Sequence, residues 1–212
     1  MKFFYECSEC GRTFDIQPEL MVCPDCSSKQ QSHEPLRGVL EVGMEGSIGP
    51  DFDIFDILPV EKKFFPPIPV GNTPLWTPIN LRRRTGFTNL FIKDDSLNPT
   101  GSLKDRASYL VAAFAVRERI SDVVVASTGN AASSMAGIGA AASLGIRIFI
   151  PKSAPRAKRV QSLQYGARVV LVDGNYDMAY ELSMAYTREH GGLSRNLSLI
   201  HISEPTRPLY IS

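Results

Sequence analysis

Apolar and polar residues alternate in blocks along the middle of the chain, and these blocks predict strands and helices in turn. Residues 89–94 fit a strand, and the continuous apolar runs at 123–126, 146–150 and 167–172 have the length of strands covered on both faces. The intervening segments predict helices: one from Ser102, one of small residues up to Leu144, one over 156–165 and one from about 173 to 190. Alternation at this spacing predicts an α/β fold, an open parallel sheet with flanking helices.

The helix that begins at Ser102 has local signals of its own. Asp105 follows Ser102 by three residues, which resembles a capping box. The residues expected to form its apolar face are Leu103, Ala107, Leu110, Val111 and Phe114. Asp105 and Arg106 are explained by capping and a structural ion pair without any chemistry.

Lys104 lies in the run Asn98–Arg106 (NPTGSLKDR), between the first predicted strand and its helix. In parallel sheets ligands bind at the carboxyl ends of the strands, and this run falls at such an end. A lysine amine there can form a Schiff base with pyridoxal phosphate, an electron sink for carbanion chemistry. The alternative is an exposed lysine in the first turn of a surface helix.

A second polar turn, Ser127-Thr128-Gly129-Asn130, comes directly after a buried strand and directly before a helix. Backbone N–H groups at a helix N-terminus, together with two hydroxyls, suit a carboxylate or a phosphate. These residue types are also ordinary turn and N-cap residues. Two such turns at one edge of one sheet, one of them with a lysine, favour a ligand site.

The four cysteines lie near the N-terminus as two CxxC pairs, Cys7 with Cys10 and Cys23 with Cys26. Two such pairs, 12 residues apart, match a zinc ribbon in which four thiolates form a closed, structural site. Local disulfides or free thiols are the alternative. A redox CxxC is disfavoured because neither pair follows a strand and opens a helix.

Composition narrows the function classes. The 212 residues are 43% hydrophobic and 21% charged, with a net charge of +1, which gives no electrostatic argument for a nucleic acid or an anionic membrane as partner. No apolar run is long enough to span a bilayer, and Glu6 and Cys7 interrupt any signal-peptide core. We therefore expect a cytoplasmic protein.

The pattern divides the chain into four zones. We expect a zinc ribbon at 1–32, an extended arm at 33–70 that lies over another surface, and an α/β catalytic region at 71–196. Residues 197–212 form the fourth zone. Their first part, 197–207, resembles the translation of a transposon-end sequencing adapter, so we expect a non-native tail.

Several motifs in order carry a family resemblance: Gly71–Leu75 (GNTPL), the lysine run, Ala126–Asn130 (ASTGN) and the stretch with Lys158, Gln161, Gly166 and Ala167. Over about residues 3–196 the chain resembles fold-type II pyridoxal phosphate (PLP) enzymes, and among them the threonine synthases, several of which carry a four-cysteine ribbon. The resemblance implies a lyase that converts O-phospho-L-homoserine and water to L-threonine and phosphate, and a parent protein that forms a homodimer.

The same resemblance implies roles for individual residues. Lys104 would be the Schiff-base lysine and the acid/base at the substrate carbons, and Asn130 would hold the 3′ oxygen of the cofactor ring. The substrate carboxylate would lie on Ser127, Thr128 and Gly129. Two positions depart from the usual pattern: Leu103 replaces a common Phe, and Ala131 replaces a usual Thr. The second departure leaves the substrate open.

The family's glycine-rich phosphate cradle, its pyridine-nitrogen ligand and most of its larger domain have no counterpart up to Asn196. We therefore expect the front half of an enzyme that does not retain its cofactor alone. The alternatives are a sister PLP enzyme, such as a cysteate synthase or a serine/threonine dehydratase, and a non-enzymatic zinc-ribbon adaptor. The ribbon contains few basic residues, which disfavours the adaptor.

Overall fold

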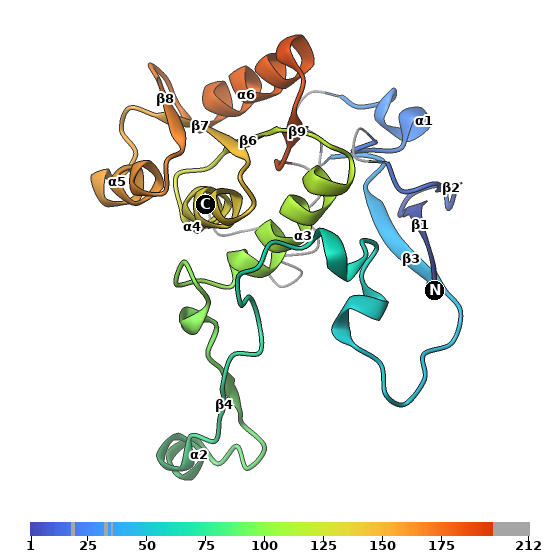
Figure 1. Ribbon diagram of the computed structural model, residues 1–212, viewed down its shortest axis with the longest axis vertical. Coiled ribbons are helices and arrows are strands. Elements are labelled where there is room, and N and C mark those ends of the chain that lie inside the picture. The colour runs from blue at the N-terminus through green and yellow to red at the C-terminus, as the bar shows by residue number, and fades with distance from the viewer. Residues whose placement is uncertain (18–19, 32–33, 35, 197–212) are drawn as a thin grey trace.

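The computed structural model describes residues 1–17, 20–31, 34 and 36–196 and contains a four-stranded parallel sheet, in the upper part of Figure 1. The strand order is β8-β7-β6-β9. The strands are β6 (Asp122–Ala126), β7 (Gly145–Pro151), β8 (Arg168–Val172) and β9 (Leu193–Ser194). The expected α/β fold with an open parallel sheet is confirmed, and β9 is a strand that the hydrophobic pattern did not reveal.

Four helices flank this sheet: α3 (Lys104–Arg117), α4 (Asn130–Ala141), α5 (Arg156–Gln164) and α6 (Tyr176–His190). The residues of β6 alternate between two apolar clusters. Val123 and Val125 pack with residues of α3 and α4, whereas Val124 and Ala126 pack with Ala179 of α6. The sheet therefore separates α3 and α4 on one face from α6 on the other, as a parallel sheet covered on both faces requires.

One strand expected in this sheet lies elsewhere. Only Ile92–Lys93 (β5) of the predicted strand at 89–94 is extended, and it pairs antiparallel with β4 (Leu75–Trp76). With α2 (Ile79–Thr85), these strands form the unit at the bottom of Figure 1. The prediction was wrong because the apolar pattern of a short strand does not identify its partner, and β4 is near in sequence. In addition, β8 is half exposed rather than buried, since it is an edge strand.

The N-terminal part folds as a three-stranded antiparallel sheet in the order β2-β1-β3. Its elements are β1 (Lys2–Cys7), β2 (Thr13–Phe14), α1 (Pro24–Ser27) and β3 (Leu40–Glu45). Because β3 pairs along the whole of β1, this sheet uses residues beyond the segment 1–32 that the cysteine spacing outlined.

Residues 54–70 lie against α3. They contain short 3₁₀ helices at Ile54–Ile57 and Lys62–Phe64. The Tyr109 hydroxyl donates to the Pro66 carbonyl at 3.1 Å, and Arg117 Nη1 donates to the Pro59 carbonyl at 2.9 Å. Side chains of α3 thus donate hydrogen bonds to two backbone carbonyls of this segment and hold it against the helix.

In the part of the chain that the structure describes, no helix combines the length and apolar character needed to cross a membrane. The tail expected at 197–212 lies outside the described residues.

Candidate functional site

Lys104 is the first residue of α3 and is partly buried. The helix begins two residues later than expected, and the Ser102 hydroxyl accepts from the Lys104 amide at 3.3 Å. The predicted capping box was wrong, because the Asp105 carboxylate turns away from the helix and binds the preceding loop. It accepts from the Thr100 amide at 2.7 Å and from the Thr100 hydroxyl. Asp105 is fully buried, so these bonds hold the turn that ends at Lys104.

The apolar face predicted for α3 is also divided. Ala107 and Val111 are in the core, but Leu103 is 47% exposed. Leu103 and Leu110 line a cavity of about 470 Å³ between α3 and residues 54–70. Lys104 does not line this cavity.

The motif at Gly71–Leu75 is hydrogen-bonded to the lysine run. The Gly71 amide donates to Asn98 Oδ1 at 2.9 Å, and the Thr73 hydroxyl donates to Asp95 Oδ1 at 2.6 Å. Arg106 donates from Nε and Nη2 to Asp95, at 2.9 and 2.8 Å. Two motifs that are separate in sequence therefore form one network around the base of α3.

The network lowers the pKa of a carboxyl group, that of Asp95, and requires a glycine at position 71. Hydrogen bonds from Arg106 and then Thr73 outweigh partial burial and lower the pKa of Asp95 to about 2. Gly71 has φ +82°, and a Cβ there would lie 3.0 Å from Arg106 Nη1. The left-handed conformation and the close approach of the guanidinium explain the glycine.

The loop Ser127–Gly129 connects β6 to α4, and Asn130 is the first residue of α4. The Ser127 hydroxyl accepts from the Gly129 amide at 3.2 Å. A Cβ built on Gly129 would meet no atom within 4 Å, so there is open space beside this loop. Hydroxyls, a helix N-terminus and adjacent space suit an anionic ligand.

Packing of α3 on α4 relates the two loops. The Ser134 hydroxyl donates to the Ser108 hydroxyl at 2.7 Å inside the core. Ser108 lies four residues after Lys104, and Ser134 lies four residues after Asn130. Residues four apart share one face of a helix, so Lys104 and Asn130 belong to the faces on which α3 and α4 meet.

The structure relates Lys104 and the Ser127 loop in a different way from the shared sheet edge that we expected. The Ser127 loop follows a strand of the parallel sheet, but Lys104 follows β5, which pairs outside that sheet. Lys104 and the Ser127 loop therefore do not share a sheet edge; the packing of α3 on α4 relates them. An amine, an amide, two hydroxyls and open space fit the donor set that pyridoxal phosphate needs.

Three residues that sequence reasoning missed surround the end of β6. Asn196 Oδ1 accepts from the Ala126 amide at 2.7 Å, and the Tyr176 hydroxyl donates to the Ala126 carbonyl at 3.2 Å. Arg195, beside Asn196, is 5% exposed. The available signal was the polar pair Arg195-Asn196 after the short segment that proves to be β9.

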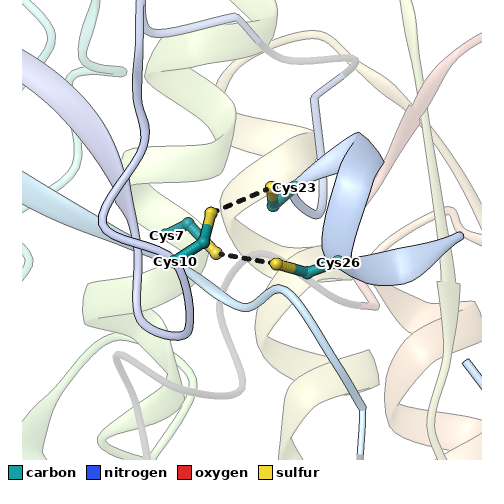
Figure 2. Close-up of side chains that lie close together, drawn as sticks. All are labelled: Cys7, Cys10, Cys23 and Cys26. Atoms are coloured by element: carbon teal, nitrogen blue, oxygen red, sulfur yellow. Dashed lines mark hydrogen bonds between the residues drawn. The ribbon is translucent and has the colours of Figure 1, made fainter. Parts of the chain in front are cut away.

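The four cysteines come together, as Figure 2 shows. The sulfur atoms of Cys7 and Cys26 are 3.8 Å apart, as are those of Cys10 and Cys23, and all four lie within 4.8 Å of one another. Zn–S bonds of about 2.3 Å in a tetrahedron place sulfur atoms about 3.8 Å apart. The cluster therefore fits a four-thiolate zinc site, and the thiols are not joined in disulfides.

Burial and hydrogen bonds shift the pKa values of two of these thiols, and a glycine lies close to two of the cysteines. Burial opposes ionisation of Cys7, but hydrogen bonds from the Cys10 and Glu9 amides lower its pKa to about 7. Burial raises the pKa of Cys26 to about 12, and hydrogen bonds shared with Cys10 and the other thiols add to that effect. Gly38 has φ +69°, and a Cβ there would lie 3.0 Å from both the Cys23 carbonyl oxygen and the Cys26 Cβ.

Comparisons with known proteins identify the family of the chain. Residues 68–204 match the family described as pyridoxal-phosphate dependent enzyme. Threonine synthase of Methanosarcina acetivorans is 29% identical over 195 residues, 85% of this chain and 45% of that protein. Threonine synthase of Mycobacterium tuberculosis is 34% identical over 154 residues, 72% of this chain and 41% of that protein. The chain thus spans less than half the length of these relatives.

Solved structures give the same fold. The processed form of threonine deaminase isoform 2 from Solanum lycopersicum is 27% identical and superposes with a TM-score of 0.54, over 57% of this chain and 34% of that one. A pyridoxal 5′-phosphate-dependent aspartate racemase is 26% identical, also with a TM-score of 0.54, over 58% of this chain and 39% of that one.

Proposed function

The chain belongs to the pyridoxal-phosphate dependent enzyme family, and we propose that it forms part of a lyase of threonine synthase type. The reaction is conversion of O-phospho-L-homoserine and water to L-threonine and phosphate. The observation that carries the proposal is the placement of Lys104 and Asn130 at the first residues of two helices that pack on each other. The similarity to threonine synthases supports the choice of reaction.

Bound pyridoxal phosphate supplies an electron sink for charge that develops on the substrate carbons. The Lys104 amine would hold the cofactor and would move protons at the substrate carbons. The Asn130 amide would donate a hydrogen bond to the ring oxygen of the cofactor. The hydroxyls of Ser127 and Thr128 and the amide of Gly129 hold the substrate carboxylate at the N-terminus of α4.

Residues behind the site position the lysine. The buried Asp105 holds Thr100, and the Asp95–Arg106 pair ties the lysine run to Thr73. Both contacts limit the freedom of the turn before α3, so that Lys104 enters its helix in one orientation.

A sister reaction on the same scaffold is the second candidate. Ala131 stands where threonine synthases usually carry Thr, and a threonine deaminase is among the similar structures. The products distinguish the candidates. A threonine synthase releases phosphate from phosphohomoserine, a cysteate synthase releases it from phosphoserine, and a serine/threonine dehydratase forms pyruvate or 2-oxobutyrate. These assays use the full-length gene product.

The four cysteines are assigned to structural zinc, because a site with four thiolates leaves no coordination position for a substrate. A ribbon at 1–32, an arm at 33–70 and a catalytic region at 71–196 remain our proposed division of the chain, and a homodimer our proposed assembly.

Trapping with borohydride tests the role of Lys104. The chain is mixed with excess pyridoxal phosphate and reduced, and the modified lysines are mapped by mass spectrometry. We expect preferential labelling of Lys104, since its amine lies at the N-terminus of α3, on the face that packs on α4. Lys104→Arg removes that label, and Lys152→Arg, an exposed site paired with Asp173, is the matched control.

Equal labelling of Lys104 and exposed lysines would contradict the proposed function. In the full-length gene product, a visible cofactor absorbance that survives Lys104→Ala would contradict it as well.

A further inference from the structure

The four cysteines of the cluster are not equally shielded from solvent. Cys10 is exposed, whereas Cys7, Cys23 and Cys26 are each at most 5% exposed. Zinc keeps its cysteine ligands deprotonated, and the thiolate is the form of cysteine that oxidants attack. Cys10 is therefore the ligand that an oxidant in solution reaches first.

A second sulfur atom lies close to the exposed one. The sulfur atoms of Cys10 and Cys23 are 3.8 Å apart, and those of Cys7 and Cys26 form the other close pair (Figure 2). Both pairs join one CxxC turn to the other. Sulfur atoms in a disulfide are about 2 Å apart, so a movement of about 2 Å joins Cys10 to Cys23.

Contacts outside the cluster hold the two CxxC turns together. The Glu9 carboxylate, within the first turn, accepts from Arg37 Nε at 3.1 Å and from the Gly38 amide at 3.2 Å. The Gly38 carbonyl in turn accepts from the Cys23 amide at 2.7 Å. None of these bonds involves a thiolate, so they keep Cys10 close to Cys23 while the coordination changes.

We propose that the cysteine cluster is a redox switch, in which a hydroperoxide oxidises Cys10 and Cys23 to a disulfide and zinc is released. The Cys10 thiolate attacks the peroxide and becomes a sulfenic acid, and the Cys23 thiolate then displaces hydroxide from that sulfur. With hydrogen peroxide, two thiolates, one peroxide and two protons give one disulfide and two waters. The sulfur atoms lose the two electrons that the peroxide gains, and zinc keeps its charge.

Release of zinc follows from the number of ligands that remain. Only the thiolates of Cys7 and Cys26 are left, whereas a structural zinc site takes four ligands. The inference rests on the assignment of the cysteines to zinc and not on the reaction proposed for Lys104.

The N-terminal sheet contacts the segment that lies over α3, so the switch has a route to the lysine helix. Phe3 of β1 lines a cavity of about 400 Å³ together with Leu58 and Pro59. The Pro59 carbonyl accepts from Arg117 of α3. Because the core around the cysteines is small, loss of the ion should loosen β1 and, with it, the segment 54–70.

Zinc release and disulfide mapping test the proposal. The chain is loaded with zinc, metal analysis gives the zinc bound per chain, and a chromophoric indicator follows the zinc released by hydrogen peroxide. We expect one zinc ion for each peroxide consumed. Trypsin cleaves after Arg12, between the two CxxC pairs, so a bond between Cys10 and Cys23 joins two peptides and a bond within one pair does not. Tandem mass spectrometry of the joined peptides identifies the two cysteines.

Cys10→Ser and Cys26→Ser are matched variants, since each removes one thiolate. In Cys10→Ser, peroxide should release zinc on the order of tenfold more slowly, because no exposed thiolate remains. Cys26→Ser keeps both reacting sulfur atoms and should still form their disulfide. If a variant does not retain zinc, the mapping in the unsubstituted chain decides the question.

Hydrogen exchange measures the effect on the fold. Oxidation should speed exchange in β1 and in residues 54–70 and leave β6 and β7 protected, and reduction with dithiothreitol in the presence of zinc should reverse the change. Unchanged exchange in β1 after zinc release would contradict the loosening of the N-terminal sheet.

Two further outcomes would overturn the switch and leave the zinc site and the proposed function intact. One is retention of zinc in peroxide, and the other is loss of zinc with disulfides inside the CxxC pairs or with sulfinic acids at the cysteines. A chain that binds no zinc would overturn the zinc assignment and the switch together, while borohydride labelling of Lys104 would still test the reaction.

Discussion

Two neighbouring aspartates illustrate how single residues support the lysine. Asp105 is fully buried and accepts hydrogen bonds from Thr100, whereas Asp95 remains 20% exposed and is shared by Arg106 and Thr73. Both contacts join residues that flank Lys104 to the loop before α3. The residues around the lysine are therefore joined by hydrogen bonds, and the charged side chains among them fix the conformation of the loop before α3.

Asp95→Asn should change the pH dependence of stability. The folded pKa of Asp95, about 2, lies below the value of about 3.9 expected for an unfolded chain, so its ionised form stabilises the fold at neutral pH. That contribution is lost as the pH falls from about 4 toward about 2. Because Asp95 and Arg106 are both partly exposed, we expect Asp95→Asn to lower the free energy of unfolding at neutral pH by about 1 kcal/mol.

Urea unfolding of the original chain and of Asp95→Asn, at several pH values, checks this. The difference between their free energies of unfolding should be largest near pH 7 and vanish near pH 2. Asp51→Asn, at an exposed position, is the control. A difference that does not change with pH would contradict the assignment.

Among the elements, α4 is built to approach α3 closely. Its buried residues are mostly small: Ala132, Ser133, Ser134, Ala136, Gly137 and Gly139. A Cβ on Gly137 would lie 2.5 Å from Thr100 Cγ2, and one on Gly139 would lie 2.4 Å from Ile146. Small residues therefore allow α4 to contact both the lysine run and β7, which brings Asn130 and Lys104 onto facing surfaces.

The buried hydroxyl pair between these helices gives a test at the same scale. Ser108→Ala and Ser134→Ala should each cost about 1 to 2 kcal/mol, since each leaves one fully buried hydroxyl without its partner. The double variant should cost less than the sum of the two. Strictly additive free energies of unfolding would show that the hydroxyls are not coupled.

At the scale of the whole molecule, the apolar core of the N-terminal part is separate from those of the parallel sheet. The first contains Cys7, Cys23 and Cys26 with Phe14 and Leu40 packed on them; the others lie on the two faces of the parallel sheet, one against α3 and α4 and one against α6. The first core is small, so a bound ion contributes a large share of its stability. The structure thus predicts that zinc supports the N-terminal sheet and not the parallel sheet.

Zinc removal tests this separation. Chelation should speed hydrogen exchange at the amides of β1 and β3 and leave those of β6 and β7 protected, because the parallel sheet has its own core. Cys10→Ser, which removes the one exposed thiol, should weaken zinc binding with little loss of packing. Metal analysis and exchange mass spectrometry provide both readouts; equal loss of protection in both sheets would contradict the prediction.

The sequence by itself determined the α/β class, the three longer strands, the helices between them and the four-cysteine quartet. Those features depend on local periodicity and spacing, which act over a few residues. Only the tertiary structure decided that β5 pairs with β4, that Asp105 binds Thr100, and that Arg195 lies buried beside β6. The partner of a short strand or of a polar side chain depends on which distant segments are packed together, and no local pattern encodes that choice.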